Sequence, residues 1–85
     1  MPIITALIHR NGDTKTTLLD QLGAAYAAVH AALRALADAH PHERNYYPEP
    51  GRYPQARAQY QARADALRTV AESLWAEIEA LDAPN

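Results

Sequence analysis

The sequence predicts an all-α protein: an antiparallel helical hairpin of two long helices that assembles as a homo-oligomeric helical bundle. Two segments repeat apolar residues at the alternating spacing of three and four that is typical of a packed helix. A proline-rich segment, through which no helix can run, separates them. The chain of 85 residues is too short to bury a large core alone, and it has no cysteine for a disulfide.

The opening segment, residues 1–12, is expected to form a short strand or an extended arm. Residues 2–9 are rich in β-branched and aliphatic side chains, and Asn11-Gly12 then favours a turn. No other segment resembles a strand, so this one has no partner within its own chain. It would pair with a copy of itself, lie against the helices as an arm, or fray, and these alternatives stay open.

The first helix is predicted over residues 14–39. Asp13 and Thr14 carry side-chain oxygens that can accept hydrogen bonds from the free N–H groups of the first turn. Pro41 biases the preceding residue away from helical geometry and so ends the helix near Ala39. The apolar seam is expected to comprise Leu19, Leu22, Tyr26, Val29, Leu33, Leu36 and His40.

The second helix is predicted over residues 54–82. Pro54 suits the first helical position, because its missing N–H would have no partner there. Val70 and Trp75 flank the seam and widen its apolar face, which a single hairpin cannot cover. A homodimeric four-helix bundle or a larger ring of hairpins is therefore expected. The seam itself comprises Tyr60, Ala64, Leu67, Ala71, Leu74, Ile78 and Leu81.

The turn between the helices, residues 40–53, is the candidate binding segment. It is rich in proline, tyrosine and arginine, whereas a simple spacer is usually built from Gly, Ser, Asn or Asp. Arginine suits phosphate because its guanidinium donates two parallel hydrogen bonds, and aromatic faces stack on a base. The start of the second helix adds free N–H groups to the same region. The predicted ligand-binding residues are Arg44, Tyr46, Tyr47, Arg52, Tyr53 and Arg57.

A structural role for the same turn is the alternative. The tyrosines would then pack over the helix ends, and the arginines would pair with Glu43, Glu49 and Asp65. His40 and His42 with Glu43 also suggest a metal site, but their spacing matches no helical zinc signature. We therefore predict no metal and no cofactor.

Charge and composition argue against several other classes. The net charge of −2 does not favour a nucleic-acid partner, because neutralising phosphates needs a basic surface. The apolar run over residues 3–8 is too short to cross a bilayer or to serve as a signal peptide, so a cytoplasmic protein without a membrane partner is expected. Ser73 is the only serine and has no base at a suitable spacing, so we predict no catalytic residue and no enzyme.

Two stretches resemble a family of short helical proteins encoded by phages and prophages. Residues 8–14 and the following Leu18-Leu19 resemble an opening I-H-L-N-G before Thr or Ser. Residues 41–48 resemble a turn P-H-G-R-D-Y-Y-P, from which the chain departs at Glu43 and Asn45. The resemblance implies a phage accessory protein acting in the host cytoplasm, and it carries no biochemical activity with it.

Together these features predict a non-enzymatic phage or prophage accessory protein. Its turn would bind a phosphorylated small molecule, such as a cyclic nucleotide of host defence. The alternatives are a protein-interaction module, as inhibitor or adaptor of a host or phage protein, and a structural assembly component. The expected partners are further copies of the chain, a phosphorylated ligand and, in the first alternative, a host protein.

Overall fold

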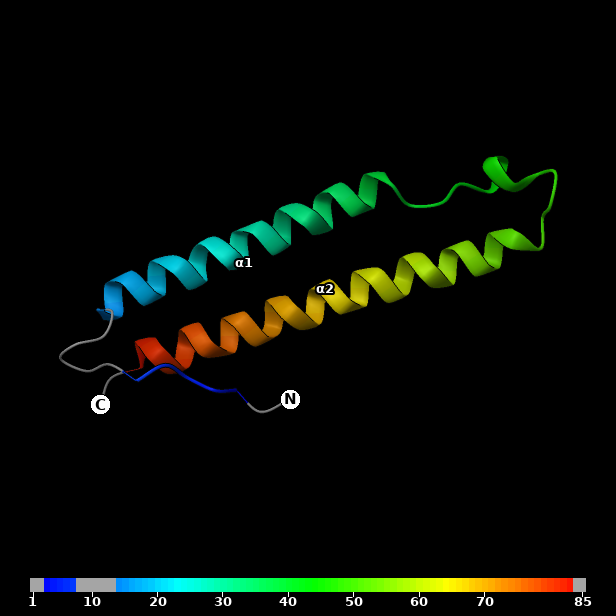
Figure 1. Cartoon of the computed structure of the whole chain (residues 1–85). Helices are drawn as coiled ribbons and strands as arrows, with labels where there is room; N and C mark the ends of the chain where they lie inside the picture. Colours follow the sequence, from blue (N-terminus) through cyan, green and yellow to red (C-terminus); the bar gives the residue numbers. More distant parts are fainter. Residues whose placement is uncertain (1–2, 8–13, 84–85) are drawn as a thin grey trace.

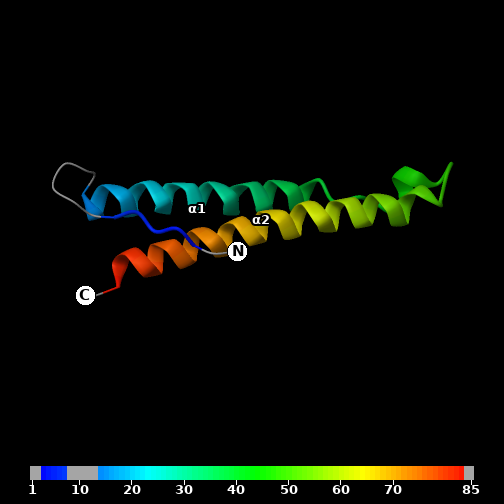
Figure 2. The ribbon, with the colours of Figure 1, turned by 60° about the horizontal axis from the view of Figure 1, so that its bottom comes forward.

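The computed structural model describes residues 3–7 and 14–83. Two long helices, α1 (Lys15–Asp38) and α2 (Arg52–Asp82), pack against each other along their length, and a short 3-10 helix, η1 (Glu43–Tyr46), lies between them in the chain. Both views show the helices side by side and antiparallel, joined at one end by the turn (Figures 1 and 2). The predicted all-α helical hairpin is confirmed.

The predicted strand at the start of the chain is not formed in residues 3–7, which adopt no regular secondary structure. Ile3 lies against α2 beside Thr69 and Ala76, whereas Ile4 and Leu7 are each 84% exposed. A strand needs a partner for its backbone groups, and the described residues offer none. The rest of the predicted arm lies outside the described residues.

Local hydrogen bonds explain the bounds of α1, which begins and ends one residue inside the predicted range. The Thr14 hydroxyl caps the helix by accepting from the Thr17 N–H at 3.1 Å. At the other end, the His40 ring lies with Nδ1 2.9 Å from the Ala37 carbonyl oxygen. Asp13, the other expected cap, lies outside the described residues.

Helix α2 begins two residues before the predicted start. Arg52 is its first residue, so Pro54 occupies the third position rather than the first. That position still belongs to the first turn, where backbone N–H groups have no partner within the helix, so proline costs no hydrogen bond. Backbone bonds from Arg52 to Glu49 and from Tyr53 to Pro50 join the turn directly to the helix.

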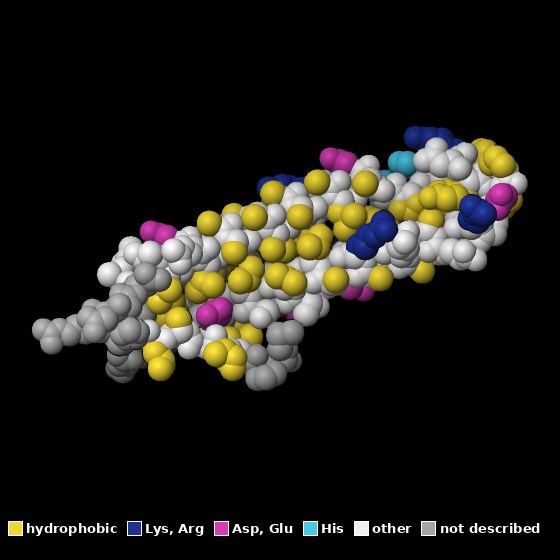
Figure 3. All heavy atoms as spheres, in the orientation of Figure 1, with side chains coloured by type: hydrophobic (Ala, Val, Ile, Leu, Met, Phe, Trp, Pro, Cys, Tyr) yellow, Lys and Arg dark blue, Asp and Glu magenta, His cyan; other side chains and the backbone are white. Residues whose placement is uncertain are grey.

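Small side chains form the interface between the helices. Among the described residues, the buried ones are Ala64, Ala71 and Leu81, with 2%, 5% and 8% of their surface exposed. The larger seam residues from Leu19 to Leu36 are only half-buried. Figure 3 shows hydrophobic side chains along the boundary between the helices, open to one face of the hairpin.

The hairpin is long and narrow, measuring 62 × 22 × 19 Å with a radius of gyration of 18.4 Å. A compact domain of this length would have a radius of gyration of about 12 Å. The accessible surface is 6532 Å², whereas a compact monomer of 9.4 kDa exposes about 5,000 Å². Neither described helix is long and apolar enough to cross a membrane.

Candidate functional site

The turn end of the hairpin gathers aromatic and cationic side chains around Tyr53. The rings of Tyr46 and Tyr53 lie 5.9 Å apart between centroids, tilted by 39°. On the start of α2, the Arg57 guanidinium carbon lies 5.7 Å from the centre of the Tyr53 ring, a cation–π distance. Tyr53 therefore links an aromatic contact with η1 to a cation on α2.

A groove at this end, here called the turn groove, has a volume of about 560 Å³. Its polar side chains are aromatic, cationic or neutral, and no carboxylate of the described residues lines it. The lining residues are His40, Pro41, Tyr53, Pro54, Arg57, Ala58, Tyr60 and Gln61. Such a lining favours an anionic, planar ligand, because it offers rings for stacking and a guanidinium for charge pairing.

His40, which follows α1, and Tyr60 of α2 both line the turn groove. A carbonyl oxygen only accepts hydrogen bonds, so Nδ1 of His40 must donate to Ala37, and Nε2 of a neutral ring is left as an acceptor. The His40 ring also meets the rings of His42 and Tyr60, at centroid distances of 4.4 and 6.2 Å. These contacts hold one wall of the groove in place.

A second groove of about 390 Å³ contains Tyr46 and Arg52. Arg52 is already engaged there: its Nε lies 2.6 Å from Oε2 of Glu49, and both side chains are largely exposed. This is the ion pair that the structural alternative predicted for the turn. Part of the positive charge expected for a ligand is therefore neutralised within the turn.

The structure thus separates the six predicted site residues into three sets. Tyr53 and Arg57 share the turn groove, and Tyr46 and Arg52 share the second groove. The remaining two, Arg44 and Tyr47, are exposed on or beside η1 and line neither groove. Their roles in ligand binding stay predictions.

Two polar lining residues of the turn groove, His40 and Gln61, were not predicted as ligand-binding residues. Gln61 follows Arg57 by four positions, a spacing that places both on one face of a helix. That spacing is a usable signal in the sequence. His40 was predicted to belong to the apolar seam of the first helix. His40 and His42 form no cluster with a third metal-ligating side chain in the described parts of the chain.

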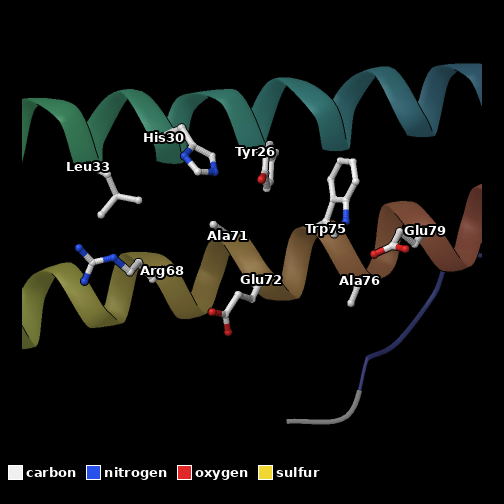
Figure 4. A pocket seen from close by; sticks show the side chains of 9 residues that line it. All are labelled: Tyr26, His30, Leu33, Arg68, Ala71, Glu72, Trp75, Ala76 and Glu79. Carbon is white, nitrogen blue, oxygen red and sulfur yellow. The ribbon is translucent and has the colours of Figure 1, made fainter.

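A further groove, here called the central groove, lies midway along the hairpin (Figure 4). It has a volume of about 330 Å³ and is lined by Tyr26, His30, Leu33, Arg68, Ala71, Glu72, Trp75, Ala76 and Glu79. Figure 4 shows Tyr26 and His30 pointing from α1 toward α2, and Trp75 pointing from α2 toward α1. Tyr26 contacts both other rings, at centroid distances of 4.5 Å to His30 and 5.4 Å to Trp75.

Two side chains of the central groove have an unpaired or uncovered part. Nε2 of His30 is buried and has no hydrogen-bond partner among the described residues. The Trp75 side chain, at the other end of the aromatic cluster, is 49% exposed. Buried polar atoms usually have a partner, and large aromatic residues are usually covered.

Searches against family models, curated proteins and solved structures found no match for the chain. The resemblance of its opening and turn to phage-encoded proteins therefore stays a prediction. Its function is inferred from the grooves and side chains described above.

Proposed function

We propose that the protein is a non-enzymatic binding protein whose turn groove holds a planar phosphorylated small molecule, such as a cyclic nucleotide. The observation that carries this proposal is the lining of the groove, which combines Tyr53, Tyr60 and Arg57 without a carboxylate. Its volume of about 560 Å³ lies in the range of small-molecule sites. A base would stack on a tyrosine ring while the guanidinium pairs with phosphate.

Arg57 is the central phosphate-binding residue of this proposal. Its guanidinium lies over the Tyr53 ring at the groove. Arg52 contributes less, because Glu49 already occupies its Nε. Arg63 lies on the same helix, outside both grooves, and makes a matched control of the same charge.

The test is calorimetric titration of the purified protein with a panel of cyclic mononucleotides and cyclic dinucleotides. Arg57→Ala is expected to weaken binding by roughly 10- to 100-fold, because it removes hydrogen bonds to a charged group. Arg63→Ala should leave the affinity within about two-fold of wild type. Equal losses in both variants, or an unchanged affinity in Arg57→Ala, would contradict the assignment of the groove.

The biological setting is inferred from the resemblance to phage proteins. We propose sequestration of a signalling nucleotide of host defence in the cytoplasm of the infected cell. Native mass spectrometry of protein purified from an infected or lysogenic host tests this, because it reads the oligomer mass and any retained ligand together. A retained mass of a few hundred daltons per site, matching a phosphorylated compound, is the expected result.

The proposal also includes self-association as a homo-oligomeric bundle. The hairpin exposes about 1,500 Å² more than a compact protein of its mass. Val70 and Trp75 remain 47% and 49% exposed. Light scattering coupled to size-exclusion chromatography should give at least twice the chain mass of 9.4 kDa. A mass of one chain at micromolar concentration would contradict self-association.

A protein-interaction module is the second candidate function. Ile4 and Leu7 are almost fully exposed apolar side chains, and with Trp75 they would suit a host or phage protein as well as a copy of the chain. A stoichiometric protein partner, together with no retained nucleotide, would favour this candidate. Growth into an open-ended array would instead favour a structural assembly component.

A further inference from the structure

We infer that the central groove is a two-fold interface, in which α2 packs antiparallel against α2 of a second copy of the chain. Arg68 of each chain then meets Glu79 of the other. This inference rests on the proposed self-association and specifies the surface and the register that produce it.

The aromatic cluster of Tyr26, His30 and Trp75 is the first basis for this inference. Its rings contact one another within one hairpin, yet Trp75 is half exposed and His30 Nε2 has no partner among the described residues. Covering an aromatic side chain stabilises an interface more than covering most other residues, because aromatic residues bury 150–250 Å² each. A second copy placed on the groove would cover this cluster.

Two of the three charged residues at the groove, Arg68 and Glu79, are self-complementary, whereas the third, Glu72, lies level with Trp75 of the second copy in this arrangement. Arg68 lies at one end of its α2 wall and Glu79 at the other. Eleven residues separate them, which is about three helical turns and roughly 16 Å, so both lie on one face of the helix. A two-fold axis that passes between Ser73 and Leu74 therefore places Arg68 of each chain opposite Glu79 of the other chain, so the ion pair forms twice.

Arg68 has donors to spare for this contact. Its Nη1 donates to Asp65 Oδ1 at 3.2 Å within the same helix, and a guanidinium carries five N–H groups. The exposed position of this pair leaves room for an approaching carboxylate.

The hairpin also has enough uncovered surface for such an interface. The excess surface of about 1,500 Å² compares with about 800 Å² that each partner buries in a stable interface of standard size. A second copy alone would therefore be large enough to cover the exposed face, without any other partner. It also explains why both signs of charge occur on one groove, whereas an unrelated partner would need its own matching pattern.

A charge-exchange experiment tests the register. Arg68→Glu and Glu79→Arg each place like charges together twice in the dimer, so each is expected to raise the dimer dissociation constant by roughly ten-fold in sedimentation equilibrium. The double variant restores both pairs in reverse and should recover an affinity within about three-fold of wild type. Within one chain the two side chains are too far apart to interact, so only a contact between chains explains this rescue. Arg63→Glu makes the same charge change outside the groove and should leave the dissociation constant unchanged.

Trp75 provides an independent measurement, because it is the only tryptophan of the chain. Dilution from micromolar to nanomolar concentration should shift its emission to longer wavelength over the same range in which the mass falls to one chain. Self-association with neither this shift nor the rescue would overturn the central-groove interface and leave the proposed homo-oligomer standing. A single chain at every concentration would overturn both. Nucleotide binding at the turn is measured separately and does not depend on either outcome.

Discussion

Single side chains supply hydrogen bonds that the helix ends cannot make for themselves. The first N–H groups and the last carbonyls of a helix have no intrahelical partner. At the start of α1, the Thr14 hydroxyl accepts a hydrogen bond from the Thr17 N–H at 3.1 Å. At its end, Nδ1 of His40 lies 2.9 Å from the Ala37 carbonyl oxygen. Both residues are exposed, so their contribution comes from these bonds and not from burial.

Thr14→Ala should lower the free energy of unfolding by about 1 kcal/mol, because the Thr17 N–H loses its acceptor. Urea denaturation followed by circular dichroism at a fixed protein concentration measures this change. Thr16→Ala makes the same substitution inside α1 and should cause no loss, since alanine is the better helix former. Equal destabilisation in the two variants would show that Thr14 does not act as a cap.

The residue types of the turn left two interpretations open, a phosphate site and structural ion pairs with Glu43, Glu49 and Asp65. Arginine and tyrosine suit a phosphorylated aromatic ligand, and this interpretation stays a prediction. The structure shows which of the arginines is paired. Glu49 engages Arg52, whereas Arg57 lies over Tyr53.

At the scale of the elements, alanine decides how closely α1 and α2 approach. Ala64 is 2% exposed and Ala71 is 5% exposed, at positions where a larger side chain would meet the facing helix. The spacing of the seam identified these positions, because alternation of three and four residues keeps one stripe facing the neighbour. Small residues leave little apolar area to bury, so the seam is tight but poor in hydrophobic stabilisation.

Ala64→Leu should destabilise the hairpin by about 1–3 kcal/mol, because the added atoms force α1 and α2 apart. Ala66→Leu adds the same atoms at an exposed position of α2 and should change the free energy of unfolding by less than about 0.5 kcal/mol. Urea denaturation of both variants at one protein concentration makes the comparison. A similar loss in both would show that the effect comes from leucine itself and not from crowding at the seam.

The bounds of the elements could be predicted to within one or two residues where a local signal exists. Thr14 marks the start of α1 and Pro41 follows its end, and both signals are local because capping and proline geometry act over a single turn. Helix α2 starts earlier than Pro54, because proline is tolerated throughout the first turn and does not single out one position. The strand alternative was wrong for residues 3–7, which form no regular secondary structure. A high β-propensity reflects how well a segment fits beside a neighbouring strand, and the described residues contain no such strand.

At the scale of the molecule, the hairpin is elongated and exposes much of its surface. Its radius of gyration of 18.4 Å and its surface of 6532 Å² exceed those of a compact chain of the same mass, and few of its described residues are buried. Folding must offset a large loss of conformational entropy, and buried apolar surface is the main source of the compensating free energy. Self-association supplies the missing area in our proposal.

The midpoint of thermal unfolding should therefore depend on protein concentration. For a dimer, with an unfolding enthalpy of about 0.7 kcal/mol per residue, it should rise by about 4 °C for each tenfold increase in concentration. Circular dichroism from 1 to 100 μM, with matched path lengths, measures this rise. Equal helix content before unfolding at all concentrations is the control. A constant midpoint would indicate that a single hairpin is stable on its own.

Properties that depend on neighbours along the chain follow from the order of the residues: the two helices, their caps, the turn and the faces they present. Hydrogen bonding within a turn and the period of 3.6 residues act locally, so pattern is sufficient for them. The grooves belong to the tertiary structure alone, because they depend on which residues of α1 lie opposite which residues of α2. Packing put His40 beside Tyr60 and Tyr26 against Trp75, and it left Trp75 half exposed at an open face between the helices.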